Sequence, residues 1–277
     1  MRVFKYLLTF LFFLNCAFGA ENKPQIKVIS LAPAVTETLF YFGYGDNLLG
    51  RTDYCSFPQE SAKIESMGSM FSPNIEKIVY LKPDYLIFQS HFDKRLKKQV
   101  EDMGLKTLAF PTPKSIDEIL TQYAAILSIF NEVPDKNLKF SEIKDNIEMI
   151  KNNSKKIERK PTVYYSLGSG HIEYTSGKES FIDDAITLAG GRNIVDDEGW
   201  SYPLEALIAK QPDIIIISKE KYNAMVNNKK YEQLEALKNE KRVIFIEDDE
   251  ITTATPRLLL KTLNKIQKGI LDFNSIN

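Results

Sequence analysis

Two glutamates, Glu76 and Glu205, occupy the same position in two related segments of this chain. The segments are SPNIEKIVYLKPDYLI (72–87) and SYPLEALIAKQPDIII (201–216). Each predicts a serine N-cap, at Ser72 or Ser201, then a short helix with proline in its first turn, a Pro-Asp turn and a buried strand. The helix dipole favours a carboxylate in the first turn by about 0.3 to 1 kcal/mol. That effect explains one glutamate, but a matched pair indicates docking to a partner.

The repeat also bears on domain organisation. Its spacing is too long for a solenoid, whose periods are roughly 20 to 50 residues. The alternative is a chance resemblance between two helix-strand units of an α/β protein, but chance does not explain why both glutamates keep the same offset. The repeat therefore predicts two similar lobes.

Two histidines, His91 and His171, are candidates for metal ligation. Each follows a predicted strand of a different lobe, so both would face a cleft between the lobes. Two opposed imidazoles can bind a haem iron or a bare metal. Loop histidines are more often solvated, and no carboxylate cluster with metal-ligand spacing accompanies these two. We therefore expect no resident cofactor.

Serines and glycines do not form a catalytic or phosphate-binding motif. TSGKES (175–180) and LGSGH (167–171) contain serines without the nucleophile-elbow pattern, and Lys178 lacks the upstream glycines of a phosphate loop. We therefore predict a protein that is not an enzyme. A secreted two-domain hydrolase or transferase, and a sensory or adhesin-like surface module, are the alternatives. A neighbouring permease and ATPase in the operon would exclude the surface module.

Six apolar runs predict buried strands, three in each half of the chain. They are 26–31, 84–89 and 106–110, followed by 162–167, 213–218 and 242–247. Helical patterns alternate with these runs, which is typical of parallel sheets. We predict two α/β lobes with central, mostly parallel sheets, over residues 24–134 and 160–277.

Residues 135–159 predict one long helix between the lobes. Apolar side chains at Phe140, Ile143, Ile147 and Ile150 give it one apolar face. The segment contains no glycine, whereas a flexible hinge favours glycine and serine. We therefore expect a rigid connector.

The matched glutamates are expected near the rim of a cleft between the lobes. Parallel α/β units place their binding crevice at the carboxyl ends of the strands. The strand of each repeated segment runs to that edge, so the helix before it begins on the same side. Glu76 and Glu205 lie in the first turns of these helices, which places them at the rim.

The first nineteen residues predict a secretory signal peptide. Arg2 and Lys5 precede an apolar run (7–14) that is far shorter than the about 20 residues of a membrane span. Small residues at 17–19 then provide a cleavage site, so we expect a periplasmic protein. A lipid anchor at Cys16 is the alternative. The formal charge of −1 gives no indication of nucleic-acid binding.

Five segments together resemble one protein family. They are VISLAPAVTETLFYFGYGDNLLGRTDYCSFP, PNIEKIVYLKPDYLIF, YTSGKESFIDDAITLAGGRNI, LEALIAKQPDIIIIS and TATPR. They are similar to the helical-backbone (class III) periplasmic solute-binding proteins of ABC importers, most of all to the cobalamin-binding member, with siderophore and haem binders as siblings. The resemblance covers about residues 26–270. It implies two lobes joined by one rigid helix, with the ligand between them.

The resemblance also implies roles for particular residues. A glutamate on each lobe of the family pairs with permease arginines, and these glutamates fall on Glu76 and Glu205. The cleft contacts of the cobalamin binder carry over as Tyr54 and Asp249. Its cleft tryptophans align near Met70, at Gln89 and one position from Trp200, the only tryptophan of the chain. The residues that could replace the missing aromatic surface are Phe71, Phe88, Tyr174 and Tyr202.

These expectations define one function and its competitors. The chain would be a monomeric receptor that captures a cobalamin-like corrinoid or another metal chelate and delivers it to an ABC permease and ATPase. A haem or ferric-siderophore binder of the same family is the alternative, and a secreted enzyme ranks below both.

Overall fold

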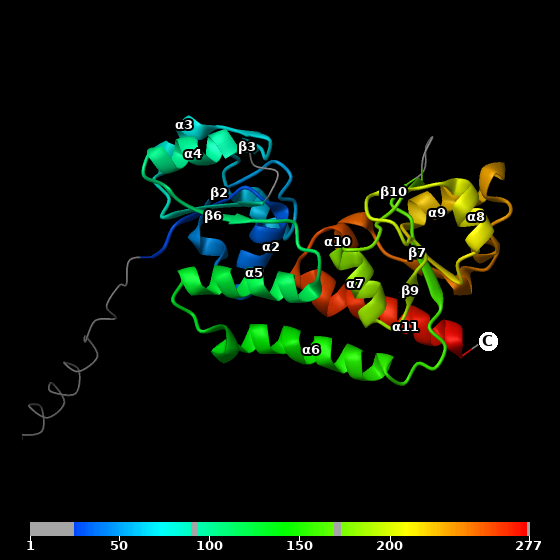
Figure 1. Cartoon of the computed structure of the whole chain (residues 1–277). Coiled ribbons are helices and arrows are strands. Elements are labelled where there is room, and N and C mark those ends of the chain that lie inside the picture. The colour runs from blue at the N-terminus through cyan, green and yellow to red at the C-terminus, as the bar shows by residue number, and fades with distance from the viewer. Residues whose placement is uncertain (1–24, 90–93, 169–172, 276–277) are drawn as a thin grey trace, which may run out of the picture.

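A computed structural model describes residues 25–89, 94–168 and 173–275. These residues form two α/β lobes that lie side by side, with a long helix running beneath both (Figure 1). The α/β fold class is confirmed. The predicted signal peptide, Cys16, His91 and His171 lie outside the described residues. Among the helices of the described part, none is long and apolar enough to cross a membrane.

The first lobe contains a four-stranded parallel sheet in the order β2-β1-β5-β6. Leu86 and Ile87, in its central strand β5, are fully buried because helices cover both faces of the sheet. A two-stranded antiparallel hairpin, β3 with β4, lies beside it. The strands are β1 (Val28–Ser30), β2 (Leu48–Arg51), β3 (Gly68–Ser69), β4 (Ser72–Pro73), β5 (Tyr85–Gln89) and β6 (Lys106–Phe110). The helices are α2 (Pro33–Phe42), η1 (Gly45–Asn47), η2 (Gln59–Lys63), α3 (Ile75–Leu81), α4 (Lys94–Asp102) and α5 (Ile116–Ile129).

The second lobe repeats this plan with a parallel sheet in the order β12-β11-β7-β9. An antiparallel pair, β8 with β10, accompanies it. The strands are β7 (Thr162–Tyr165), β8 (Glu173–Tyr174), β9 (Arg192–Asn193), β10 (Ser201–Tyr202), β11 (Ile214–Ile217) and β12 (Val243–Phe245). The helices are α7 (Phe181–Leu188), α8 (Leu204–Lys210), α9 (Lys219–Val226), η4 (Lys229–Tyr231), η5 (Glu235–Lys238), η6 (Glu240–Arg242), α10 (Asp248–Thr252), the π-helical turn η7 (Leu258–Thr262) and α11 (Leu263–Asn274).

The repeated segments form matching units, α3 with β5 and α8 with β11. Their predicted serine caps are wrong, because Ser72 and Ser201 lie in the short strands β4 and β10. The side chain of Asn74 caps α3 instead, by accepting a hydrogen bond from the N–H of Lys77 at 2.9 Å. In both copies a proline separates the serine from the helix, so the serine is too early to cap it.

The connecting helix, α6, spans Leu138–Ser154 and is shorter than the predicted 135–159. It begins late because Asn137 caps it, with its side-chain oxygen 3.1 Å from the N–H of Phe140. The residues before it form a separate turn, η3 (Pro134–Lys136).

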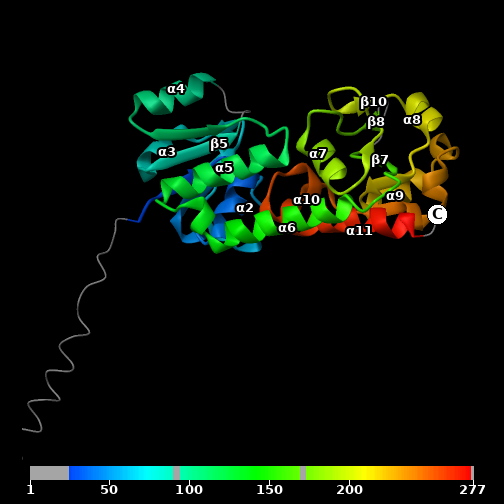
Figure 2. The same cartoon turned by 60° about the horizontal axis from the view of Figure 1, so that its bottom comes forward.

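One hydrophobic core runs beneath both lobes. Apolar side chains of α6 pack in the same cluster as those of α5 in the first lobe and α7 in the second. The C-terminal helix α11 belongs to this cluster too, and it lies beside α6 in Figure 2. Gln267 of α11 donates a hydrogen bond to the carbonyl of Ile150 at 2.8 Å, and Asn146 donates one to the carbonyl of Leu259 at 2.7 Å. The lobes are therefore held together by two helices rather than by the connector alone.

Candidate ligand-binding cleft

A cavity of about 320 Å³ lies between the two lobes. Its walls come from the start of α2 and the ends of β5 and β6 in the first lobe, and from the start of α7, the β10 hairpin and the end of α10 in the second. This is the carboxyl edge of both sheets, where parallel α/β units bind ligands. The lining residues are Pro33, Ala34, Met70, Gln89, Thr112, Pro113, Phe181, Trp200, Thr252, Thr253 and Ala254.

Three of the predicted contacts, Met70, Gln89 and Trp200, line this cavity. Trp200 is half-exposed and precedes β10, and its carbonyl accepts a hydrogen bond from the N–H of Thr175 at 3.1 Å. Met70 and Gln89 belong to the opposite lobe. The structure therefore brings together residues from both lobes, and Trp200 supplies a large apolar surface between them.

Tyr54 and Tyr174 are half-exposed and lie beside the cavity rather than in its lining. The ring of Tyr54 packs edge-on against Phe71, with 6.3 Å between ring centroids, and Phe71 directly follows Met70. Tyr174 on β8 pairs with Ser201 on β10, next to Trp200. Each tyrosine therefore extends the aromatic surface outward from its own lobe.

Two predicted contacts, Phe88 and Tyr202, are buried in hydrophobic cores instead. Phe88 packs in the cluster that contains Ile78 of α3 and Val100 of α4. Tyr202 packs in the cluster of the second lobe that contains Leu207. Tyr202 lies between exposed neighbours, whereas Phe88 follows the buried Ile87, so no common pattern in the sequence told which side chain pointed inward. Neither side chain is available to a ligand in this structure.

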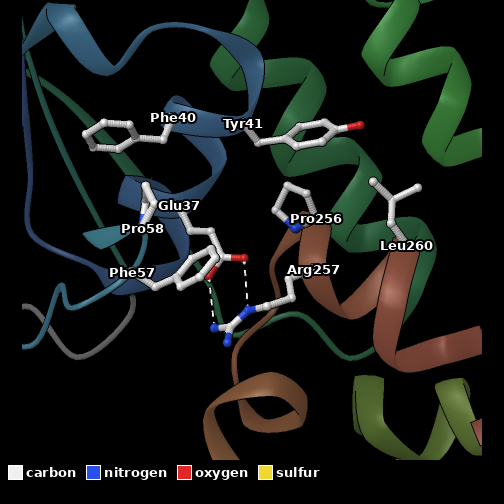
Figure 3. Close-up of a pocket in the computed structure, with 8 residues that line it drawn as sticks. All are labelled: Glu37, Phe40, Tyr41, Phe57, Pro58, Pro256, Arg257 and Leu260. Carbon is white, nitrogen blue, oxygen red and sulfur yellow. Dashed lines mark hydrogen bonds and ion pairs between the residues drawn. The ribbon is translucent and has the colours of Figure 1, made fainter. Parts of the chain in front are cut away.

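Asp249, the predicted polar contact, is held by Arg257. The Nη1 atom of Arg257 lies 2.8 Å from Oδ2 of Asp249, whose side chain is 61% exposed. The same guanidinium pairs with Glu37 of α2, with 3.1 Å between Nη2 and Oε2. Figure 3 shows this ion pair at one side of a second, mainly apolar pocket, with the ring of Phe57 against Arg257. Arg257 therefore links the edge of the cleft to the first lobe.

Glu37 is buried, with only 6% of its side chain exposed. Burial raises the pKa of its carboxyl group because a low-dielectric environment disfavours the carboxylate, while the charge of Arg257 acts in the opposite direction. The net direction is upward. The pair thus carries a desolvation cost that the guanidinium only partly offsets.

Glu76 and Glu205 are exposed in the first turns of α3 and α8. Within the described part of the chain, neither carboxylate has a hydrogen-bond or ion-pair partner. Each helix follows a short hairpin strand and leads into a central strand of its lobe. The two glutamates therefore present equivalent free negative charges, one on each lobe.

A match over most of the chain identifies its family. A family model for periplasmic binding proteins matches residues 28–250. The chain belongs to the periplasmic binding protein family.

Related sequences agree with this assignment to the periplasmic binding proteins. The vitamin B12-binding protein of Vibrio cholerae is 26% identical over 268 residues, which cover 94% of each chain. An uncharacterized ABC transporter substrate-binding lipoprotein of Bacillus subtilis is 26% identical over 246 residues, or 86% of this chain and 78% of the relative.

Solved structures share the fold of this periplasmic binding protein. The periplasmic vitamin B12 binding protein of V. cholerae has a TM-score of 0.71 and 24% identity, covering 91% of this chain and 98% of that one. The periplasmic heme-binding protein of Roseiflexus sp. RS-1, in apo form, has a TM-score of 0.73 and 18% identity, covering 89% and 99%. Proteins named for different ligands thus have this architecture.

Sequence reasoning missed the remaining eight lining residues of the cleft in this periplasmic binding protein. Thr253 and Ala254 begin the TATPR segment, and Phe181 directly follows TSGKES, so the quoted family segments were the available signal. Gly177 of TSGKES lies so close to the carbonyl of Asp197 that a Cβ atom would not fit. Pro33 and Ala34, at the start of α2, lie in the first of these segments, but their residue types alone give no signal because small apolar residues are common there. Across the described residues, no group of three or more potential metal ligands is present.

Proposed function

We propose that this protein is the extracytoplasmic substrate-binding component of an ABC importer. It captures a cobalamin-like corrinoid or another metal chelate and delivers it to a membrane permease with its ATPase. The observation that carries this proposal is the cavity lined by both lobes in a member of the periplasmic binding protein family. The relatives named as vitamin B12-binding proteins and as an ABC transporter lipoprotein support it.

The cleft favours a large ring with polar edges. Trp200 offers a stacking surface, while Gln89 and the threonines at 252 and 253 offer directed hydrogen bonds. A haem or a ferric siderophore is the second candidate, because tryptophans of the cobalamin binder align near Met70 and at Gln89, and because proteins named as heme-binding share the fold. The geometry presents a binding cleft, and we propose no catalysis.

Titration with cyanocobalamin, hemin and a ferric siderophore tests this proposal. We expect one of the three to bind at micromolar concentration or tighter and to change its visible spectrum. Failure of all three to bind would remove the corrinoid, haem and siderophore assignments together. Replacing His91 or His171 would shift the Soret band if the ligand is haem.

Trp200→Ala and Tyr54→Ala should each weaken corrinoid binding by on the order of 1 to 3 kcal/mol, because each removes a large apolar side chain that would pack against the ligand. Isothermal titration with cyanocobalamin measures the loss. Tyr80→Ala is the matched control, since Tyr80 is an exposed tyrosine on α3 that does not line the cleft. If all three variants bound cyanocobalamin as tightly as the unmodified protein, the ligand would not stack on these side chains.

Binding should move the lobes only slightly. The core that includes α6 and α11 is shared by both lobes, and the hydroxyl group of Tyr123 in α5 donates a hydrogen bond to the carbonyl of Ala254 at 3.1 Å. Wide closure would break these buried contacts. Small-angle X-ray scattering profiles of the free and bound protein should therefore nearly superimpose. A large compaction on binding would contradict the rigid connection.

The protein is proposed to act outside the inner membrane as a monomer. Residues 1–19 would be removed on export, so the N-terminus of the native protein should lie near Ala20 or Glu21. N-terminal sequencing decides between this cleavage and a lipid anchor at Cys16.

A further inference from the structure

An open groove lies beside Glu76 on the first lobe, between α3 and α4. Its volume is about 540 Å³, and it does not overlap the lining of the cleft. The two helices lie together at the upper end of the first lobe in Figure 1, on the far side of that lobe from α6. The lining residues are Asn74, Ile75, Glu76, Val79, Gln99 and Met103.

The walls of this groove present apolar side chains to solvent. Met103 is 52% exposed, although it lies at the end of α4 with its N–H bonded to the carbonyl of Gln99 at 3.2 Å. Gly104, which has a left-handed φ of 87°, ends the helix there. Methionine is flexible and polarizable, and it is common on surfaces that bind proteins. The groove therefore has an adaptable apolar wall that no described segment covers.

The repeat-related position of the second lobe is apolar too. Val79 corresponds in the repeat to Ile208 of α8. Both side chains are partly buried; Ile208 packs against the hydrophobic cluster of the second lobe, and Val79 lines the groove. Glu76 and Glu205 are thus equivalent in charge and position, and an apolar side chain follows each of them three residues later.

Glu76 gives the groove an uncompensated negative charge at its rim. The nearby cation Lys77 pairs with Glu65, with 2.6 Å between Nζ and Oε1. On α4, Lys97 and Lys98 pair with Glu101 and Asp102. A complementary partner would present a basic side chain next to an apolar one.

We propose that this groove receives an apolar side chain of the permease, adjacent to the basic side chain that pairs with Glu76. The first lobe then docks through charge and apolar insertion together. The inference rests on the proposed function, because it extends the docking site at Glu76.

The test uses the ligand-free mature protein and its own permease-ATPase complex in lipid nanodiscs. Val79→Gln/Met103→Gln removes the apolar character of the groove and leaves every charge in place. We expect the Kd for the complex to rise roughly tenfold or more, as for a central apolar contact. The dependence of Kd on salt should stay unchanged, since salt screens charges and not apolar contacts. Glu76→Gln should instead reduce that salt dependence.

Two controls separate docking from folding and from general loss of apolar surface. Leu138→Gln replaces an 86% exposed leucine at the start of α6 and should leave the Kd unchanged. Met103→Leu keeps the apolar wall and should retain binding. Thermal unfolding of the double glutamine variant should match that of the unmodified protein, because both replaced side chains border solvent.

Unchanged affinity of the double glutamine variant would overturn the groove proposal, provided that Glu76→Lys still weakens binding. If Glu76→Lys and Glu205→Lys also leave the Kd unchanged, both the proposed docking role of the glutamates and the groove proposal are wrong. A loss of affinity accompanied by a changed salt dependence would also overturn it, since the groove residues would then act through charge.

Discussion

Replacing Arg257 with methionine should lower the free energy of unfolding by about 3 to 5 kcal/mol, the cost of removing one partner of a buried ion pair. The variant leaves the buried carboxylate of Glu37 without its guanidinium partner, and the ring of Phe57 loses its contact with the cation. Denaturant unfolding followed by fluorescence measures the loss. The effect should be large because Glu37 and Arg257 join the two lobes across their seam.

Two further variants show whether the buried charge is the cause. Glu37→Leu/Arg257→Met removes both charges and should recover most of the lost stability, since apolar replacement of a whole buried pair is often neutral or stabilising. Asp249→Asn removes the exposed partner of the same arginine and should cost at most about 1 kcal/mol. Equal losses in Asp249→Asn and Arg257→Met would contradict the role of Glu37.

The loss in Arg257→Met should also depend on pH. Burial holds the folded-state pKa of Glu37 above its usual value, and removal of Arg257 raises that pKa further. A group whose pKa is raised by folding stabilises the folded state when protonated, and this contribution disappears as the pH rises through the folded-state pKa. The destabilisation should therefore be smaller near about pH 4, the ordinary range of glutamate, than at neutral pH.

Local patterns were sufficient to predict three of the four strands in each parallel sheet, while β2 and β9 were missed. The runs that became β1, β5, β6, β7, β11 and β12 consist mainly of apolar residues between helical patterns, and the observed strands lie within two residues of the predicted bounds. The repeat located α3 and α8 because each is a seven-residue helix followed by a buried strand. Such features depend on neighbouring residues and so can be read from the chain.

Contacts between distant segments could not be read in the same way. Glu37 and Arg257 are 220 positions apart, and nothing in their local sequence distinguishes them from surface charges. The packing of α11 against α6 likewise depends on the assembled lobes. Phe88 and Tyr202 failed as predicted contacts for a related reason: aromatic type indicates a large apolar side chain, but only packing decides whether it faces a ligand or a core.

Glu76→Lys/Glu205→Lys should reduce ligand uptake by at least about 100-fold while leaving ligand affinity within a few fold. Both carboxylates are exposed, lie outside the lining of the cleft and have no partner within the described residues. Reversing them sets two lysines against the basic side chains proposed for the permease, and like-charge contacts cost several kcal/mol, with each 1.4 kcal/mol corresponding to about tenfold. Uptake into cells and titration of the purified protein measure the two effects separately.

Asp117→Lys/Asp145→Lys is the matched control, because it changes the net charge equally on α5 and α6, and it should leave uptake unchanged. Normal uptake in the double glutamate reversal would show that the permease recognises another surface, because reversing two charges at a docking interface must weaken docking.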